Sequence, residues 1–186
     1  MGSQEVITIE EDFTLIRFQN DDDEIFTAER HIKQGLIQFH FGIKGKAKFM
    51  FNQGSYALDL KDEKALLLYN PQKELPLHLE LAPNSWVISV IVSIKKFHTL
   101  FSDEANYIPF LTIENKDKKY YSESDISPSM AIVLSQLFHY HLHPSIKNLY
   151  YKGKSYELLS LYFNRSEDPD AEQCPFLIDE ENVLKI

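Results

Sequence analysis

The feature that most constrains the fold is a succession of short apolar segments between about residues 25 and 94. The segment Leu36–Ile43 alternates with period two in its second half. One of its faces carries Phe39, Phe41 and Ile43, and the other carries Gln38, His40 and Gly42. Further strand-like segments are Lys48–Phe51, Tyr56–Leu60, Ala65–Tyr69, Leu75–Leu81 and Trp86–Ile94. Turn-forming residues separate them, and short strands spaced in this way predict an antiparallel barrel or sandwich.

The periodicity becomes helical after Ile94. We expect Ser93 to cap a short helix that runs to Leu100, and residues 109–113 to return to a strand. Ser127-Pro128 supplies a capping hydroxyl and a proline for the first turn, so a helix is predicted to begin there. His143-Pro144-Ser145 is expected to end this helix and to open another. In the second helix, Gly153 is expected to allow a close approach of a neighbouring element.

Composition excludes several classes of protein. The 186 residues suffice for one domain with a real core, and the net charge of −9 disfavours unaided binding to nucleic acid. Lys44, Lys46 and Lys48 alternate along a strand-like segment, which is typical of a solvated edge. The only cysteine, Cys174, fits a reducing cytoplasm. The first residues do not resemble a signal peptide, and no apolar run approaches the roughly 18 residues that span a membrane.

Patterns for nucleophilic or phosphate chemistry are absent from the sequence. There is no G-x-S-x-G motif, and Gly42–Lys46 is too short for a P-loop, so it is interpreted as the end of a strand and its turn. His139 and His143 are predicted to be i and i+4 neighbours on one helix, with His141 pointing elsewhere. A zincin motif needs Glu directly after the first histidine, and Tyr140 stands there, so no metal site is predicted.

Two parts of the chain carry a family resemblance. The first comprises Phe39–Gly45, Leu66–Pro71 and Trp86–Ser89, and it looks like the N-terminal barrel of AraC-family transcription regulators. The second is Leu149–Leu159, which is similar to the "LYLEAKALELL" helix of the subgroup that contains siderophore-responsive regulators. The matching positions there are Lys154, Glu157, Leu158 and Leu159. The resemblance covers roughly residues 30 to 186.

The resemblance implies a fold and a function. The fold class it implies is mainly β, a cupin-like barrel (a double-stranded β-helix or jelly roll) followed by two helices. The expected organisation is an effector-binding barrel over residues 1–120, a helical dimerisation element over 121–166, and over 167–186 a linker and the start of a DNA-binding domain. Val183, Leu184 and Ile186 look like the beginning of a helix that continues into that domain. The expected partners are a small-molecule effector, a second copy of the chain, and DNA through the further helix-turn-helix domain.

The metal motifs of cupin enzymes are degraded in this chain. When the first motif, G-x5-H-x-H-x3,4-E-x6-G, is anchored on Gly45, its three ligand positions fall on residues of which His31 alone is a usual metal ligand. Lys33 takes the place of the second His and Gln38 that of the Glu, and the second motif places Pro76 at the fourth ligand. We therefore expect no metal, no cofactor and no enzymatic activity. A metal-dependent cupin isomerase or dioxygenase, and a stand-alone binding protein, remain the alternatives.

The candidate effector site lies in the barrel. Gln38, His40, His78 and Trp86 are predicted to line it, because polar and flat aromatic side chains are typical of small-molecule pockets. The alternative is a packed interior in which a neighbour satisfies His40. The ligand itself is not readable, and a sugar, a siderophore, an aromatic metabolite or no ligand remain open.

The candidate dimer surface lies on the last helix. Leu149, Tyr156, Leu159 and Phe163 form an apolar stripe there, which is predicted to contact a second copy. The alternative is that the stripe packs on the barrel of its own chain.

Overall fold

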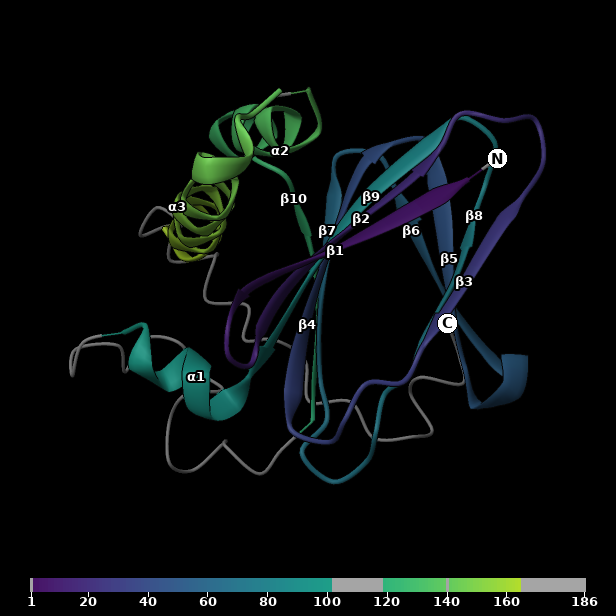
Figure 1. Cartoon of the computed structure of the whole chain (residues 1–186). Helices are drawn as coiled ribbons and strands as arrows, with labels where there is room; N and C mark the ends of the chain where they lie inside the picture. Colours follow the sequence, from purple (N-terminus) through teal and green to yellow (C-terminus); the bar gives the residue numbers. More distant parts are fainter. Residues whose placement is uncertain (1, 102–118, 140, 165–186) are drawn as a thin grey trace.

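Two antiparallel β-sheets make up most of the protein. The computed structural model describes residues 2–101, 119–139 and 141–164. One sheet has six strands in the order β1-β2-β9-β4-β7-β10, and the other has four in the order β3-β8-β5-β6 (Figure 1). Their bounds are β1 Ser3–Glu10, β2 Phe13–Asn20, β3 Phe26–Arg30, β4 Leu36–Lys44, β5 Lys46–Phe51, β6 Tyr56–Lys61, β7 Lys64–Tyr69, β8 Leu77–Leu81, β9 Ser85–Ser93 and β10 Tyr120–Asp125.

The strand order is that of a jelly roll. From β2 to β9 the strands distribute as β2-β9-β4-β7 in one sheet and β3-β8-β5-β6 in the other, which is the result of folding one long antiparallel ribbon onto itself. The strands β1 and β10 extend the larger sheet at its two edges. The predicted fold class, a cupin-like barrel followed by two helices, is confirmed. Because β10 pairs with β7 along Tyr120–Asp125, the sheet continues past residue 120, where the barrel was expected to end.

Apolar side chains from both sheets fill the space between them. Phe49 and Leu79 from the four-stranded sheet pack with Leu66 and Ile91 from the six-stranded sheet in one buried cluster. Gln38 and His40 lie on this inner face of β4, since Phe39 and Phe41 belong to the cluster on the other side of the sheet. The sequence left the inward face of each strand open, and the structure places Gln38 and His40 inward.

Three helices cover the outer face of the six-stranded sheet. They are α1 Ile94–Thr99, α2 Pro128–His139 and α3 Pro144–Phe163, and all of them lie on one side of the barrel (Figure 1). Phe39, Phe41 and Val90 of the sheet share a second buried cluster with Leu137 of α2 and Leu158 of α3. Both faces of this sheet are thus buried, which explains why β9 reads as a nearly continuous apolar run.

The helix starts follow the predicted capping residues. Ser93 Oγ accepts a hydrogen bond from Lys96 N, and Ser127 Oγ accepts one from Met130 N. His143 caps α3 by accepting from Ser145 N, with Pro144 in the first turn. All three starts agree with the prediction. The predicted strand over residues 109–113 lies outside the described residues.

Two glycines shape the corner between β4 and β5. A Cβ on Gly42 would come within 2.1 Å of the Lys61 carbonyl oxygen, and Gly45 has a φ of +71°, which side chains rarely tolerate. The interpretation of this segment as a strand end and its turn is confirmed. The expectation for Gly153 is wrong, because no atom lies within 4 Å of a Cβ placed there.

Candidate functional site

A line of hydrogen-bonded polar side chains crosses the apolar barrel interior. His40 of β4 lies opposite Ser89 of β9 in the antiparallel pairing, and Gln38 is two residues before His40 on the same face. The His40 Nδ1 atom is 2.6 Å from Ser89 Oγ, and its Nε2 atom is 2.9 Å from Gln38 Oε1. The amide of Gln38 donates to the Leu75 carbonyl oxygen at 2.6 Å. We call Gln38, His40 and Ser89 the polar relay.

The hydrogen bonds of the relay select one tautomer of His40. Because Gln38 donates through Nε2 to Leu75, its Oε1 atom is left to accept from His40 Nε2–H. The His40 Nδ1 atom then accepts from the hydroxyl of Ser89. Each ring nitrogen thus has a partner with a neutral imidazole. The packed alternative is correct in this respect, since neighbours do satisfy His40.

Burial keeps His40 uncharged. Its side chain is 0% exposed, and its ring centroid lies 4.1 Å from that of Phe49. Burial lowers the pKa of His40 from 6.5 to about 3, because the imidazolium would lose its hydration without gaining a carboxylate partner. The relay therefore presents neutral donors and acceptors near pH 7.

The Ser89 hydroxyl, the His40 imidazole and the Gln38 amide follow one another in the order of a catalytic triad, in which a serine is the nucleophile and a histidine its base. Two properties oppose catalysis. A lowered pKa makes His40 a weak base, and the Gln38 amide cannot stabilise an imidazolium as the buried carboxylate of a catalytic triad does. The relay is better suited to recognising a neutral group than to activating Ser89.

Two residues predicted for this site lie elsewhere. His78 alternates with the inward Leu77 and Leu79, so it lies on the outer face of the four-stranded sheet, where its Nε2 atom is 3.3 Å from Glu29 Oε1. Trp86 lies on the outer face of the larger sheet. The structure brings Gln38 and His40 together but places neither His78 nor Trp86 with them.

Trp86 belongs to the contact between the barrel and α2. Its ring stacks on Phe138 at 5.1 Å between centroids, and its Nε1 atom donates to Asp21 Oδ1 at 2.7 Å. The Lys44 ammonium lies 5.2 Å from the centroid of the Trp86 ring, a distance typical of a cation–π contact. This aromatic residue therefore holds a helix in place.

Histidines do not form a metal centre in the described part of the chain. No group of three potential His, Cys, Asp or Glu ligands comes together there. His31 lies at the surface with Nδ1 3.6 Å from Glu74 Oε2. The prediction that His139 and His143 are neighbours on one helix is wrong, because His139 ends α2 whereas His143 caps α3.

The predicted dimer stripe packs mostly on the barrel. Leu159 is 3% exposed, Tyr156 makes an edge contact with Phe13, and Phe163 packs on Phe39. The exception is Leu149, which is 73% exposed. The alternative that the stripe packs within its own chain is correct for these three residues.

Sequence reasoning missed several polar residues. Ser89 interrupts the apolar run of β9, and its position opposite His40 becomes visible only when β4 and β9 are paired. Glu5 and Glu10 went unnoticed because residues 1–24 were not predicted to form strands, although β1 and β2 pair along their whole length. The alternating positions Val6 and Thr8, and Phe13 and Leu15, are a signal for strands in this part of the chain. That signal could have indicated the strands but not the partners of Glu5 and Glu10.

This chain is similar in fold to several solved structures, but no match was found by sequence. No protein-family model matches the sequence, and no curated protein matches it. Among solved structures, ToxT from Vibrio cholerae aligns over 94% of this chain and 62% of its own length, at 13% identity and a TM-score of 0.48. An RmlC-like cupin from Desulfovibrio desulfuricans aligns over 49% of this chain and 81% of its own length, at 11% identity and a TM-score of 0.39.

A regulator domain also occurs among these structures. The cupin domain of an XRE-family transcriptional regulator from Enterobacter cloacae aligns over 49% of this chain and 95% of its own length, at 12% identity and a TM-score of 0.38. Oxalate decarboxylase, at a TM-score of 0.37, shows that enzymes occur among them too. At such identities and scores, function has to be argued from this chain's own residues.

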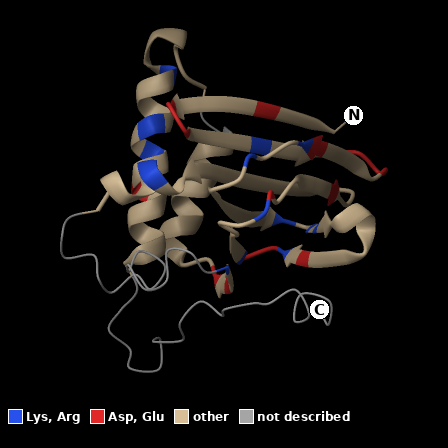
Figure 2. Cartoon of the chain, turned by 90° about the horizontal axis from the view of Figure 1, so that it is seen from below, with Lys and Arg blue, Asp and Glu red and all other residues tan. Residues whose placement is uncertain are grey.

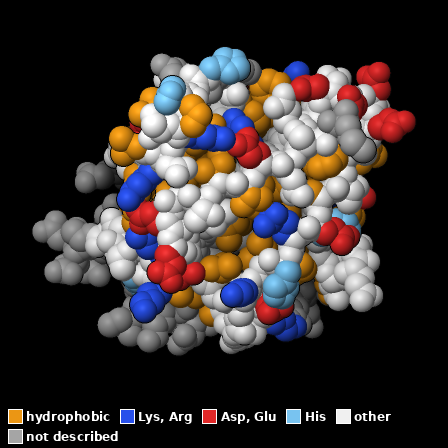
Figure 3. All heavy atoms as spheres, viewed as in Figure 1, with side chains coloured by type: hydrophobic (Ala, Val, Ile, Leu, Met, Phe, Trp, Pro, Cys, Tyr) orange, Lys and Arg blue, Asp and Glu red, His pale blue; other side chains and the backbone are white. Residues whose placement is uncertain are grey.

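The molecular surface is mixed in charge. On the face shown in Figure 3, Lys and Arg side chains are interspersed with Asp and Glu and with hydrophobic groups. Within the described residues, no helix has the length and apolar character needed to cross a membrane.

Proposed function

We propose that this chain is the effector-sensing part of a cytoplasmic AraC-type transcription regulator. The observation that carries the proposal is the polar relay, which lies among the buried apolar side chains between the two sheets of the jelly roll. The resemblance of Phe39–Gly45 and Leu149–Leu159 to AraC-family segments supports it from the sequence. In this proposal, a small molecule exchanges hydrogen bonds with the relay, and contact with DNA belongs to a further domain.

The effector of this proposal is uncharged. Among the described residues no Asp, Glu, Lys or Arg is buried, so the interior offers no counterion. A carboxylate or ammonium group brought inside would lose its hydration without a partner, which costs several kcal/mol. A mainly apolar molecule with one or two hydroxyl or carbonyl groups matches Ser89, His40 and Gln38.

A thermal-shift screen tests the proposal. Neutral hydroxylated and carbonyl metabolites are compared with carboxylates of the same carbon skeleton, since a ligand of the native state raises the melting temperature. The shift is expected for a neutral compound in the wild type and in His78→Gln, and it is expected to vanish in Ser89→Ala. Stabilisation by carboxylates alone, or an undiminished shift in Ser89→Ala, would contradict the site.

The second part of the proposal is a homodimer through the outward side of α2 and α3. Leu149 is 73% exposed, and Ile132 and Ile146 are exposed at 62% and 49%. Exposed aliphatic residues on the two helices, with Ile146 and Leu149 three residues apart on α3, mark an interaction surface better than the buried stripe does. Leu149→Asp is expected to give the molar mass of a monomer in light scattering. Leu149→Ala is expected to give that of a dimer, with a weaker association than in the wild type. A dimeric, folded Leu149→Asp protein would remove this surface from the dimer.

We further propose that the chain is not an enzyme. The lowered pKa of His40 and the loss of three of four cupin ligand positions support this view. Elemental analysis of purified protein tests the alternative, because stoichiometric Fe, Mn, Ni or Zn would favour a metal-dependent cupin enzyme.

A further inference from the structure

Helix α3 is anchored to the barrel in two different ways along its length. In its first ten residues, Pro144–Gly153, Tyr151 alone is buried, whereas the second half buries Ser155, Leu158, Leu159 and Tyr162. The second half, together with Tyr151, belongs to the apolar cluster on the outer face of the sheet. The first half contacts β1 largely through charged side chains.

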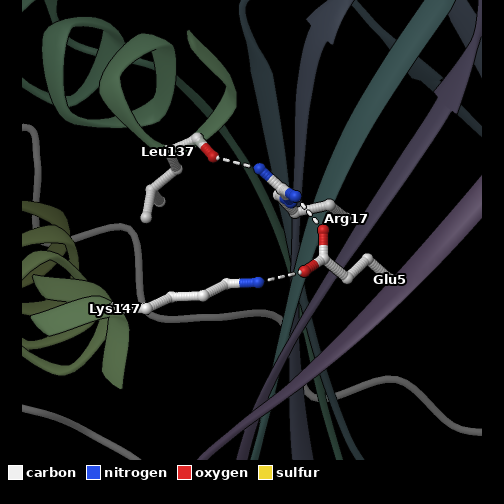
Figure 4. A network of polar contacts seen from close by, with 4 residues as sticks. All are labelled: Glu5, Arg17, Leu137 and Lys147. Carbon is white, nitrogen blue, oxygen red and sulfur yellow. Dashed lines mark hydrogen bonds and ion pairs between the residues drawn. The ribbon is translucent and has the colours of Figure 1, made fainter. Parts of the chain in front are cut away.

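Glu5 of β1 is the first of these contacts. Its Oε1 atom lies 2.8 Å from Lys147 Nζ of α3, and its Oε2 atom pairs with Arg17 of β2 (Figure 4). Arg17 also donates to the Leu137 carbonyl oxygen at 2.8 Å, in the last turn of α2, where carbonyl groups lack helical partners. One carboxylate thus links β1 to α3 directly and to α2 through Arg17.

Glu10, at the other end of β1, is the second. Its Oε1 atom accepts from Lys152 Nζ at 2.6 Å and from the Tyr156 hydroxyl at 2.7 Å, both on α3. Its Oε2 atom pairs with Lys96 of α1, the helix that follows β9 directly. Figure 2 shows basic residues spread along the long helix beside these strands.

The charges at these two carboxylates are unbalanced. Arg17, Lys96, Lys147 and Lys152 face two glutamates, so that removing one negative charge leaves two cations facing each other. Two cations that had faced the same carboxylate repel each other once its charge is removed. Because the lysines are partly exposed, their ion pairs with the glutamates are also sensitive to salt. An apolar contact such as that of Leu158 has neither property.

We propose that Glu5 and Glu10 form an ionic clasp that holds the first half of α3 reversibly on the barrel, while the second half stays fixed. Gly153 lies at the boundary between the two halves, and a glycine inside a helix is less favourable than an alanine at the same position. Opening the clasp releases residues 144–153 without unfolding the apolar half. If the proposed dimer is correct, this segment also carries its exposed residues Ile146 and Leu149, so the clasp connects β9 and α1 to the dimer surface.

Hydrogen exchange of the 186-residue protein tests the clasp. In Glu5→Gln/Glu10→Gln, the amides of residues 148–153 are expected to exchange about tenfold faster than in the wild type, the effect of removing several partly exposed ion pairs. The amides of residues 158–163, none of which contacts Glu5 or Glu10 in the hydrogen bonds and ion pairs above, are expected to keep their rates. Glu157→Gln is the matched control, because Glu157 pairs with Lys154 at 3.1 Å within the same helix and, among the described residues, forms no ion pair with β1.

A salt series on the wild type provides the same test without a mutation. Raising ionic strength from roughly 0.05 M to roughly 1 M screens exposed pairs, so residues 148–153 are expected to lose protection while residues 158–163 keep theirs. Equal rates in wild type and double variant, or an equal increase in both halves, would overturn the proposal. If the double variant loses its far-UV circular dichroism, Glu10→Gln and the salt series decide the question.

Discussion

The two faces of the six-stranded sheet are both buried, yet they handle polar groups in opposite ways. On the inner face, Gln38, His40 and Ser89 are neutral and fully enclosed. On the outer face, apolar residues occupy the centre and charged groups such as Glu5 and Glu10 stand at the edge, partly in contact with solvent. The comparison shows where each interaction is stable. Neutral hydrogen bonds persist in the dry interior, whereas ion pairs stay where water reduces the cost of the charges.

The difference also separates two functions. The inner face suits recognition of a neutral ligand, because nothing there compensates a charge. The outer face suits adjustment of the helices, because ion pairs at its edge respond to charge and salt while the apolar centre does not. The experiments below probe this difference, from the largest expected effect to the smallest.

Truncating the apolar anchor of α3 is expected to have the largest effect. Leu158 is 0% exposed, so Leu158→Ala should lower the free energy of unfolding by about 2–5 kcal/mol through lost burial and a cavity. Leu149→Ala, the matched control on the same helix, should change it by less than about 0.5 kcal/mol. Urea unfolding measures both, and equal losses would contradict the division of α3 into two halves.

Acid should destabilise the protein through His40. The pKa of His40 is lowered to about 3 in the folded state, so below 6.5 the unfolded chain binds a proton that the folded chain excludes. Stability is complete above that value and falls as pH decreases toward 3. Between about pH 7.5 and about pH 5 the loss should be on the order of 2 kcal/mol.

Two variants isolate this contribution. His40→Gln should remove that part of the pH dependence, although it lowers stability at every pH. His78→Gln should leave the pH dependence intact, since His78 stands at the surface beside Glu29. Urea unfolding at several pH values gives the slopes, and an unchanged slope in His40→Gln would show that the inner face tolerates a charge.

Removing the charge of Glu10 should have a smaller effect on global stability. Glu10→Gln is expected to cost about 1 kcal/mol or less at low salt and less still at high salt, because the pairs are partly exposed. Glu11→Gln, its neighbour in the turn, should have no effect. Hydrogen bonds from Lys152, Lys96 and Tyr156 lower the pKa of Glu10 from 4.5 to about 2.

The direction of that pKa change predicts how the clasp responds to acid. A lowered carboxyl pKa means that the clasp contributes its full stability above 4.5 and loses it as pH falls through 2. Exchange rates of residues 148–153 should therefore rise in acid in the wild type and stay flat in Glu10→Gln after correction for intrinsic rates. A flat profile in both proteins would argue against Glu10 as part of the clasp.

The contact between Trp86 and Phe138 offers the smallest and most convenient signal. Trp86 is the only tryptophan, so its fluorescence reports the docking of α2. Phe138→Leu should change the emission of Trp86, because it removes the stacked ring while keeping an apolar side chain. Phe101→Ala, which affects contacts with Phe97 and Phe163, should leave the emission unchanged.

Period-two patterning and capping chemistry are local, and they predicted much of the fold. The alternation of Gln38 and Phe39 separated the two faces of β4, although not which of them points inward, and Ser93, Ser127 and His143-Pro144 located three helix starts. These features depend on residues close in the chain, so the sequence determines them by itself.

Which surface a residue meets was decided by tertiary structure alone. Because both faces of the six-stranded sheet are buried, alternation could not tell that Trp86 faces α2 and Ser89 faces His40. The stripe on α3 predicted burial but not its partner, which is the chain's own barrel. The sequence determined most strands between residues 36 and 93 and the starts of the three helices, since those follow from local periodicity and capping. The relay and the clasp arise only when strands distant in the chain pair and bring Gln38 to Leu75 and Glu10 to Lys152.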